Sequence, residues 1–123
     1  MHKNFLLAAA IMGFLGVALG AFGAHALRAR LTPEMLAVFE IGVRYQMYHV
    51  FALLAVAAAI GHFGPARLLT VAGWSFIAGV LIFSGSLYAL ALTSTGMFGA
   101  ITPIGGLAFL IGWACLAFVA AAL

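Results

Sequence analysis

The residues of this chain that could do chemistry are concentrated in one hexapeptide, Arg44-Tyr-Gln-Met-Tyr-His49. Arginine binds phosphate and carboxylate groups, histidine carries protons or binds metals, and tyrosine and glutamine donate and accept hydrogen bonds. The hexapeptide opens an apolar stretch, and ionisable side chains inside a membrane are costly and usually functional. We therefore take it as the first candidate site.

Haem binding, zinc binding and nucleophilic catalysis were each tested against this pattern. His25 and His49 could hold a haem iron as an axial pair, but they form a single pair, and the glycine-rich first segment leaves little room for a porphyrin. Zinc needs three or four ligands, and only Glu40 could be the third. No serine, histidine and acid are spaced as a catalytic triad. We expect no cofactor, no metal and no enzymatic activity.

The composition indicates that most of the surface faces lipid. Of the 123 residues, 67% are hydrophobic and 6% are charged, whereas a soluble domain carries roughly 25% charged residues. The net charge of +3 comes from scattered cations, so we expect no nucleic-acid partner. Cys115 is alone and cannot form an intramolecular disulfide. The sequence predicts a multi-pass protein of the cell membrane, in a bacterium the inner membrane, with membrane lipids as its first partners.

Four apolar segments are each close to the ~20 residues that cross a ~30 Å hydrocarbon core. Thr32-Pro33-Glu34 can cap and start the second helix, Gly64-Pro65 ends it, and Thr102-Pro103 repeats the start signal for the fourth. We predict a single all-α domain over 1–123, an integral membrane four-helix bundle with short loops. Its helices are expected at about 5–27, 33–63, 67–92 and 103–123.

The first segment could instead be a signal peptide, because Ala24-His-Ala26 resembles a cleavage site. Its apolar run, 5–27, is however longer than the about 7–15 residues of a signal peptide's apolar region. We expect a transmembrane helix.

The stretch 35–43 has a polar and an apolar face. Glu34, Glu40 and Arg44 share one side of a helix, whereas Phe39 and Val43 lie elsewhere. We predict an amphipathic segment at the membrane interface that precedes the spanning part of helix 2, at 45–63.

With four spans, the termini and the 2–3 connection lie on one side of the membrane and the other two connections on the opposite side. Most polar residues fall near that opposite side, where we expect His25 and His49 at comparable shallow depth. The predicted polar cluster comprises His25, Arg44, Tyr45, Gln46, Tyr48, His49, Ser84, Ser86 and Tyr88.

Glycines form a stripe along the first segment, because a 3-4-3 spacing returns to one helix face. Gly16 and Gly20 have the spacing that lets membrane helices approach closely. The stripe serves either packing within the bundle or the seam of a homo-oligomer. Its members are Gly13, Gly16, Gly20 and Gly23.

Four strings in order along nearly the whole chain resemble the YgdD-like family of small membrane proteins. They are Gly-Ala-Phe-Gly-Ala-His-Ala-Leu at 20–27, Arg-Tyr-Gln-Met-Tyr-His at 44–49, Phe-Ser-Gly-Ser-Leu-Tyr at 83–88, and Ile-Thr-Pro-Ile-Gly-Gly at 101–106 with Gly112-Trp113. The resemblance implies a four-helix integral membrane protein of unknown function, and it assigns no reaction, ligand or catalytic residue.

Two functions remain open. The first is a non-enzymatic protein that supports membrane or envelope integrity or is an accessory subunit, with a homo-oligomer or a larger membrane complex as possible assemblies. The second is a binding or transport module for a lipid-like or small ligand at the polar cluster. A cavity lined by cluster residues favours the second function, whereas mutual bonding among them favours the first.

Overall fold

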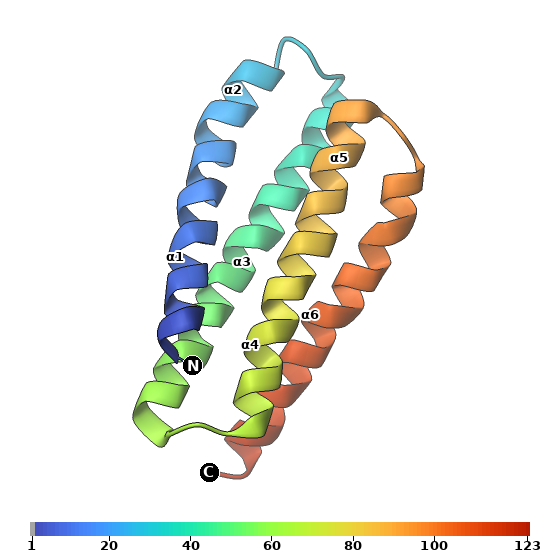
Figure 1. Cartoon of the computed structure of the whole chain (residues 1–123). Helices are drawn as coiled ribbons and strands as arrows, with labels where there is room; N and C mark the ends of the chain where they lie inside the picture. Colours follow the sequence, from blue (N-terminus) through green and yellow to red (C-terminus); the bar gives the residue numbers. More distant parts are fainter. Residues whose placement is uncertain (1) are drawn as a thin grey trace.

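The computed structural model describes residues 2–123 and contains four long helical rods packed side by side (Figure 1). All four rods are long and apolar enough to cross a membrane, which confirms the predicted all-α membrane bundle. The rods are α1 (His2–Ala18) with the π-helical turn η1 (Leu19–Gly23) and α2 (Ala24–Leu27); α3 (Pro33–Phe63); α4 (Arg67–Gly79) with the π-helical turn η2 (Val80–Ser84) and α5 (Gly85–Thr93); and α6 (Met97–Ala121).

The chain runs up and down, so that successive rods are antiparallel. Both termini and the connection between α3 and α4 lie at one end of the bundle, and the connections after α2 and α5 lie at the other (Figure 1). The two ends correspond to the two membrane sides expected from four spans.

The helix α3 begins where the sequence predicts. The hydroxyl of Thr32 accepts a hydrogen bond from the backbone N–H of Met35 at 3.2 Å, Pro33 opens the helix, and Glu34 lies in the first turn. Gly64 ends the helix with a φ of 91°, a conformation that glycine adopts without steric cost. Residues 35–43 form the first turns of this continuous helix, with a buried Phe39 and exposed charges on the other face.

The predicted start of the fourth helix at residue 103 is wrong. The helix α6 begins at Met97 and contains Pro103. Pro103 has no backbone N–H to donate to the carbonyl of Gly99, four residues earlier, but membrane helices tolerate a proline at such a position. The helix starts six residues before Pro103, so a proline near the start of a helix does not mark its first residue here.

The rods are held close by aromatic rings that lie on glycines of neighbouring helices. At each of these glycines a Cβ atom would collide with the ring or with the backbone beside it, so the helices can approach to this distance only without a side chain. Ring and glycine pairs join every rod to another: Phe39 with Gly23, Tyr88 with Gly42, Phe5 with Gly73, Phe109 with Gly79, and Phe76 with Gly112. At Gly105 the collision would be with the backbone of Phe83.

The glycine stripe of the first rod faces α3. A Cβ atom at Gly20 would lie 3.2 Å from Val43, one at Gly23 would lie 2.8 Å from the ring of Phe39, and one at Gly16 would meet Met47. Of the two uses that the sequence left open, the structure shows packing within one chain.

Candidate functional site

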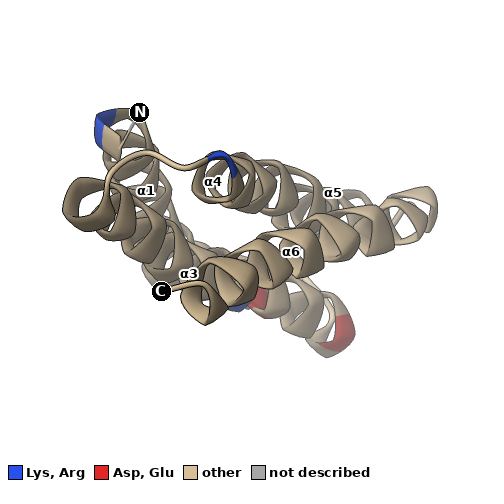
Figure 2. Cartoon of the chain, turned by 90° about the horizontal axis from the view of Figure 1, so that it is seen from below, with Lys and Arg blue, Asp and Glu red and all other residues tan. Residues whose placement is uncertain are grey.

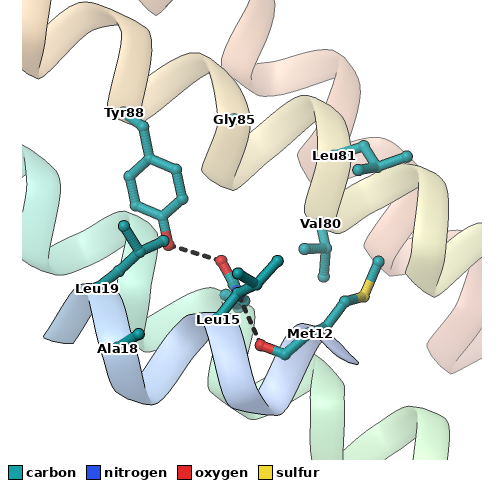
Figure 3. Close-up of a pocket in the computed structure, with 9 residues that line it drawn as sticks. Met12, Leu15, Ala18, Leu19, Val80, Leu81, Gly85 and Tyr88 are labelled. Carbon is teal, nitrogen blue, oxygen red and sulfur yellow. Dashed lines mark hydrogen bonds between the residues drawn. The ribbon is translucent and has the colours of Figure 1, made fainter. Parts of the chain in front are cut away.

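Gln46 joins three rods at the centre of the polar cluster. Its side-chain N–H group donates to the carbonyl oxygen of Met12 in α1 at 2.7 Å, and its side-chain oxygen accepts from the hydroxyl of Tyr88 in α5 at 2.7 Å. The two dashed lines in Figure 3 mark these bonds. Because 4% of the Gln46 surface is exposed, the amide is removed from lipid and depends on these partners.

A second contact between α3 and the α4–α5 rod lies beside this bridge. The hydroxyl of Ser84 donates to the backbone carbonyl of Gly42 at 2.7 Å, and Ser84 is fully buried. The ring of Tyr88 covers the same glycine. The absence of a side chain at Gly42 therefore admits the ring of Tyr88.

His49 forms the link between α3 and α6. The indole N–H of Trp113 donates to Nε2 of His49 at 3.1 Å, and Nδ1 lies 2.7 Å from the carbonyl oxygen of Tyr45. Since Nε2 accepts, the hydrogen lies on Nδ1, which donates to Tyr45. The imidazole is stacked on Phe109, with ring centroids 3.5 Å apart and an interplanar angle of 6°. Both ring nitrogens are therefore occupied and one ring face is covered.

The α5 and α6 helices are joined by two hydroxyl groups. The hydroxyl oxygens of Ser86 and Thr102 are 2.6 Å apart, and the Ser86 hydroxyl donates to the carbonyl of Phe83 at 2.9 Å. Because a hydroxyl has one hydrogen, Thr102 is then the donor to Ser86. Every rod thus takes part in at least one of these polar contacts.

The buried polar side chains of the cluster all have hydrogen-bond partners within the bundle. Within residues 2–123, no buried side-chain nitrogen or oxygen lacks a hydrogen-bond partner, and no group of three or more histidine, cysteine, aspartate or glutamate side chains could hold a metal ion. Burying a polar group costs little stability when the group is hydrogen-bonded. Leaving a buried group unpaired costs about 1–3 kcal/mol of stability. The inward-facing groups therefore act on each other.

Tyr45 and Tyr48 turn outward from the same helix. They are 37% and 51% exposed, and they line a surface hollow of about 400 Å³ between α3 and α6 together with His49, Phe109 and Trp113. We call it the α3–α6 hollow.

A second hollow, of about 330 Å³, lies between α1 and the α4–α5 rod (Figure 3). Apolar side chains such as Leu15 and Val80 form its walls, and Gln46 and Tyr88 lie beside them. The two polar groups at this hollow are those that already bond to each other.

The expectation that His25 and His49 lie at comparable depth is wrong. Gly13 of α1 is the residue that faces Val50, so His49 is level with Gly13, which is twelve residues or roughly 18 Å from His25. The reason is that α3 starts immediately after the connection, at Pro33. His25 is exposed near the end of the first rod, away from the other histidine.

Arg44 is also outside the internal network. Its side chain is exposed, and it lines a separate hollow with Glu40. The structure therefore brings together Gln46, His49, Ser84, Ser86 and Tyr88, places Tyr45 and Tyr48 on the outer side, and separates His25 and Arg44 from them.

Sequence reasoning missed the partners that complete the network. Trp113 supplies the donor for His49, Phe109 supplies its stacking surface, and Met12 supplies only a backbone carbonyl. An indole N–H that is kept from water needs an acceptor within the protein, which could have pointed to Trp113. No side-chain signal could have pointed to a backbone carbonyl.

Comparison with known proteins places this architecture in one family. Residues 19–106 match the family described as "Protein of unknown function (DUF423)". The chain is 45% identical over 111 residues to the UPF0382 membrane protein YwdK of Bacillus subtilis, covering 90% of each chain. It is 44% identical to a UPF0382 membrane protein of Haemophilus influenzae, covering 96% of this chain and 94% of the relative.

The UPF0382 inner membrane protein YgdD of Escherichia coli is 42% identical over 120 residues, which cover 94% of this chain and 88% of the relative. No solved structure matches the chain. The four family-like strings contribute residues to the internal contacts, among them Gly23, Gln46, Ser84, Gly105 and Trp113. The chain therefore belongs to the DUF423 family of membrane proteins, whose function is unknown.

Proposed function

We propose that this membrane protein has a non-enzymatic, structural role, in which it supports membrane or envelope integrity or serves as an accessory subunit of a larger complex. One observation carries the proposal. The hydrogen-bonding groups that face the interior are bonded to one another and to helix backbones, which leaves them no unpaired atom for a substrate.

The lipid that surrounds the helices explains why a membrane protein needs such a cluster. Apolar helices in lipid gain no hydrophobic free energy by associating, so close packing and interhelical hydrogen bonds must fix their arrangement. Glycine contacts alone allow a helix to slide along its partner, whereas the bonds of Gln46 and His49 are directional. The cluster is therefore suited to hold four rods in a single register.

A complementation experiment tests this role. A strain that lacks the gene is supplied with Gln46→Leu, His49→Ala or Ser84→Ala, and both the permeability of the envelope and the amount of folded protein in the membrane are measured. We expect any loss of function to follow the loss of folded protein. His62→Ala, at an exposed position outside both hollows, serves as the matched control.

A variant that accumulates and unfolds like the wild type but fails to complement would contradict a purely structural role. An accessory-subunit role further predicts that the protein, purified under mild conditions, has a mass above that of one chain. A purely monomeric protein would favour the membrane-integrity version of the proposal.

A binding module is the second candidate, and the α3–α6 hollow favours it. Aromatic rings and the edge of His49 line this hollow, a combination that suits a lipid-like or small ring-bearing ligand. Native mass spectrometry of the detergent-purified protein tests it. A retained small molecule that is lost in Trp113→Phe and kept in the exposed-site variant Trp74→Phe supports binding, and its absence from the wild type contradicts it.

A further inference from the structure

A hollow of about 270 Å³ lies between η1 and α3, apart from the internal polar network. It is lined by Gly20 on one rod and by Phe39, Glu40, Val43 and Arg44 on the other. Its volume is several times the ~30 Å³ share of one water molecule, which is enough for a small polar group. We call it the Glu40–Arg44 hollow.

Two opposite charges border this hollow. Glu40 and Arg44 are four residues apart, so they lie on the same face of α3 with their Cβ atoms about 6 Å apart. Both side chains are exposed. The hollow therefore presents a negative group and a positive group side by side, one helical turn apart.

The position of these charges along α3 places them at a membrane boundary. The 19 residues from 45 to 63 contain no lysine, arginine, aspartate or glutamate, and at 1.5 Å per residue they extend about 28 Å, close to the ~30 Å of the hydrocarbon core. Figure 2 shows charged positions at the near end of the bundle and on the far part of α3, with tan ribbon between. Arg44 is thus at the edge of the hydrocarbon, and Glu40 lies one turn further out.

We propose that the Glu40–Arg44 hollow binds the headgroup of a phospholipid that carries a phosphate followed by a primary ammonium group, as in phosphatidylethanolamine. In such a lipid the phosphate adjoins the glycerol and the ammonium is terminal. Arg44, the deeper group, binds the phosphate through its guanidinium N–H groups. The ammonium donates hydrogen bonds to the carboxylate of Glu40, the outer group. The order of the protein charges matches the order of the lipid charges.

The same arrangement discriminates against other headgroups. A phosphatidylglycerol headgroup has a net negative charge and no ammonium, so Glu40 repels it. A phosphatidylcholine headgroup has a quaternary ammonium without N–H groups, so it cannot donate a hydrogen bond to Glu40. Selectivity for the primary ammonium therefore depends on Glu40, whereas general phosphate affinity depends on Arg44.

Native mass spectrometry with defined lipids tests the proposal. The delipidated full-length protein is mixed with equal amounts of the three phospholipids with identical acyl chains, and the retained lipid is counted for each. We expect phosphatidylethanolamine to be retained best. Arg44→Gln should lower its retention about tenfold, equal to about 1.4 kcal/mol. Glu40→Gln should abolish the preference over phosphatidylglycerol, chiefly because phosphatidylglycerol is no longer repelled.

Matched controls separate the hollow from general surface charge. Arg30→Gln and Glu34→Gln remove exposed charges outside the hollow and should leave lipid retention unchanged. The double variant E40R/R44E keeps the net charge but reverses the order of the charges, and it should lose the preference for phosphatidylethanolamine. Thermal unfolding of each delipidated variant, equal to that of the wild type, shows that the fold is kept.

Three results would overturn the proposal. They are equal retention of the three lipids by the wild type, unchanged retention in Arg44→Gln, and an unchanged preference in the double variant. If a variant unfolds when delipidated, Arg44→Lys and Glu40→Asp, which keep the charges, replace it. They should retain the preference with weaker binding, and loss of all discrimination in both would contradict the assignment.

Discussion

Gln46 and His49 are the residues whose hydrogen bonds connect α3 to the other three rods, directly or through the residues they contact. Both are buried, and each polar side-chain atom of the two residues has a hydrogen-bond partner on another helix or on the backbone of α3. An interhelical hydrogen bond in a membrane protein contributes on average only about 0.6 kcal/mol to stability. The bonds of Gln46 and His49 therefore matter more for their direction than for their strength. Each bond is satisfied in one helix register and lost in neighbouring ones.

The bond between Gln46 and Tyr88 can be measured by a double-mutant cycle. We expect Gln46→Leu and Tyr88→Phe each to lower the free energy of unfolding, with a coupling of about 0.6 kcal/mol and at most roughly 1.7. Unfolding in mixed micelles with increasing sodium dodecyl sulfate gives the free energies. Tyr48→Phe, at an exposed tyrosine, is the control and should change stability by less than about 0.5 kcal/mol. Strict additivity of the two substitutions would show that the bond contributes nothing.

The two histidines of α3 should differ strongly. His49→Ala removes a ring stacked on Phe109 and leaves the Trp113 indole N–H without its acceptor, so we expect a loss of about 2 kcal/mol or more. His62 is exposed near the helix end, and His62→Ala should cost less than about 0.5 kcal/mol. The near-ultraviolet circular dichroism of tryptophan, followed through unfolding, reports both. Equal losses would remove the reason for assigning a special role to His49.

At the scale of the helices, close approach sets how near the rods lie and how they are rotated. Rings from one rod lie on glycines of the next, and this pattern fixes both the distance between rods and their rotation. The π-helical turns η1 and η2 add one feature, because a wider turn rotates the residues that follow it. Glu40 and Arg44 border the hollow beside η1, and Ser84, which bonds to α3, ends η2.

Two adjacent glycines of α6 test the role of close approach. A Cβ atom at Gly105 would collide with the backbone of Phe83 in η2, whereas one at Gly106 would lie 3.9 Å from its ring, an ordinary contact. Gly105→Ala should therefore destabilise the bundle by roughly 1–3 kcal/mol. Gly106→Ala should be neutral or stabilising, since alanine favours a helix by up to about 1 kcal/mol. The same micelle titration measures both, and similar effects at the two positions would disprove the contact.

The whole molecule is an up-and-down bundle with both termini at one end (Figure 1). Four rods are an even number, so the amino and carboxyl termini must lie on the same side of the membrane, with the connections 28–32 and 94–96 on the other.

Reporter fusions test this topology. A reporter that is active on one side of the membrane only is fused at residue 2, after residue 95 and after residue 123. The two terminal fusions should give the same signal and the internal fusion the opposite one. Protein levels, measured by immunoblot, control for expression. Opposite signals from the two termini would exclude four spans.

Much of the fold could be predicted from the chain without coordinates. The lengths of the apolar segments set four spans, and Thr32-Pro33 and Gly64 marked the bounds of α3 because capping and left-handed backbone conformation depend on local residues. The predicted start at Thr102-Pro103 was wrong because the same local signal as at Thr32-Pro33 lies inside a helix that already begins at Met97. The candidate site was predicted less well, since its composition depends on which helix levels meet.

The sequence by itself determined that the surface of this protein faces lipid and that the chain has four spans. It also determined the glycine stripe and the polar positions on α3, because each follows from residue types and the period of a helix. Only the tertiary structure decided that Gln46 contacts Met12 and Tyr88 and that His49 contacts Trp113 and Phe109. It also decided that His25 lies far from His49. The reason is physical. Helix period fixes the face of each residue, but the axial register between rods arises from ring–glycine contacts and hydrogen bonds between residues that are distant in sequence.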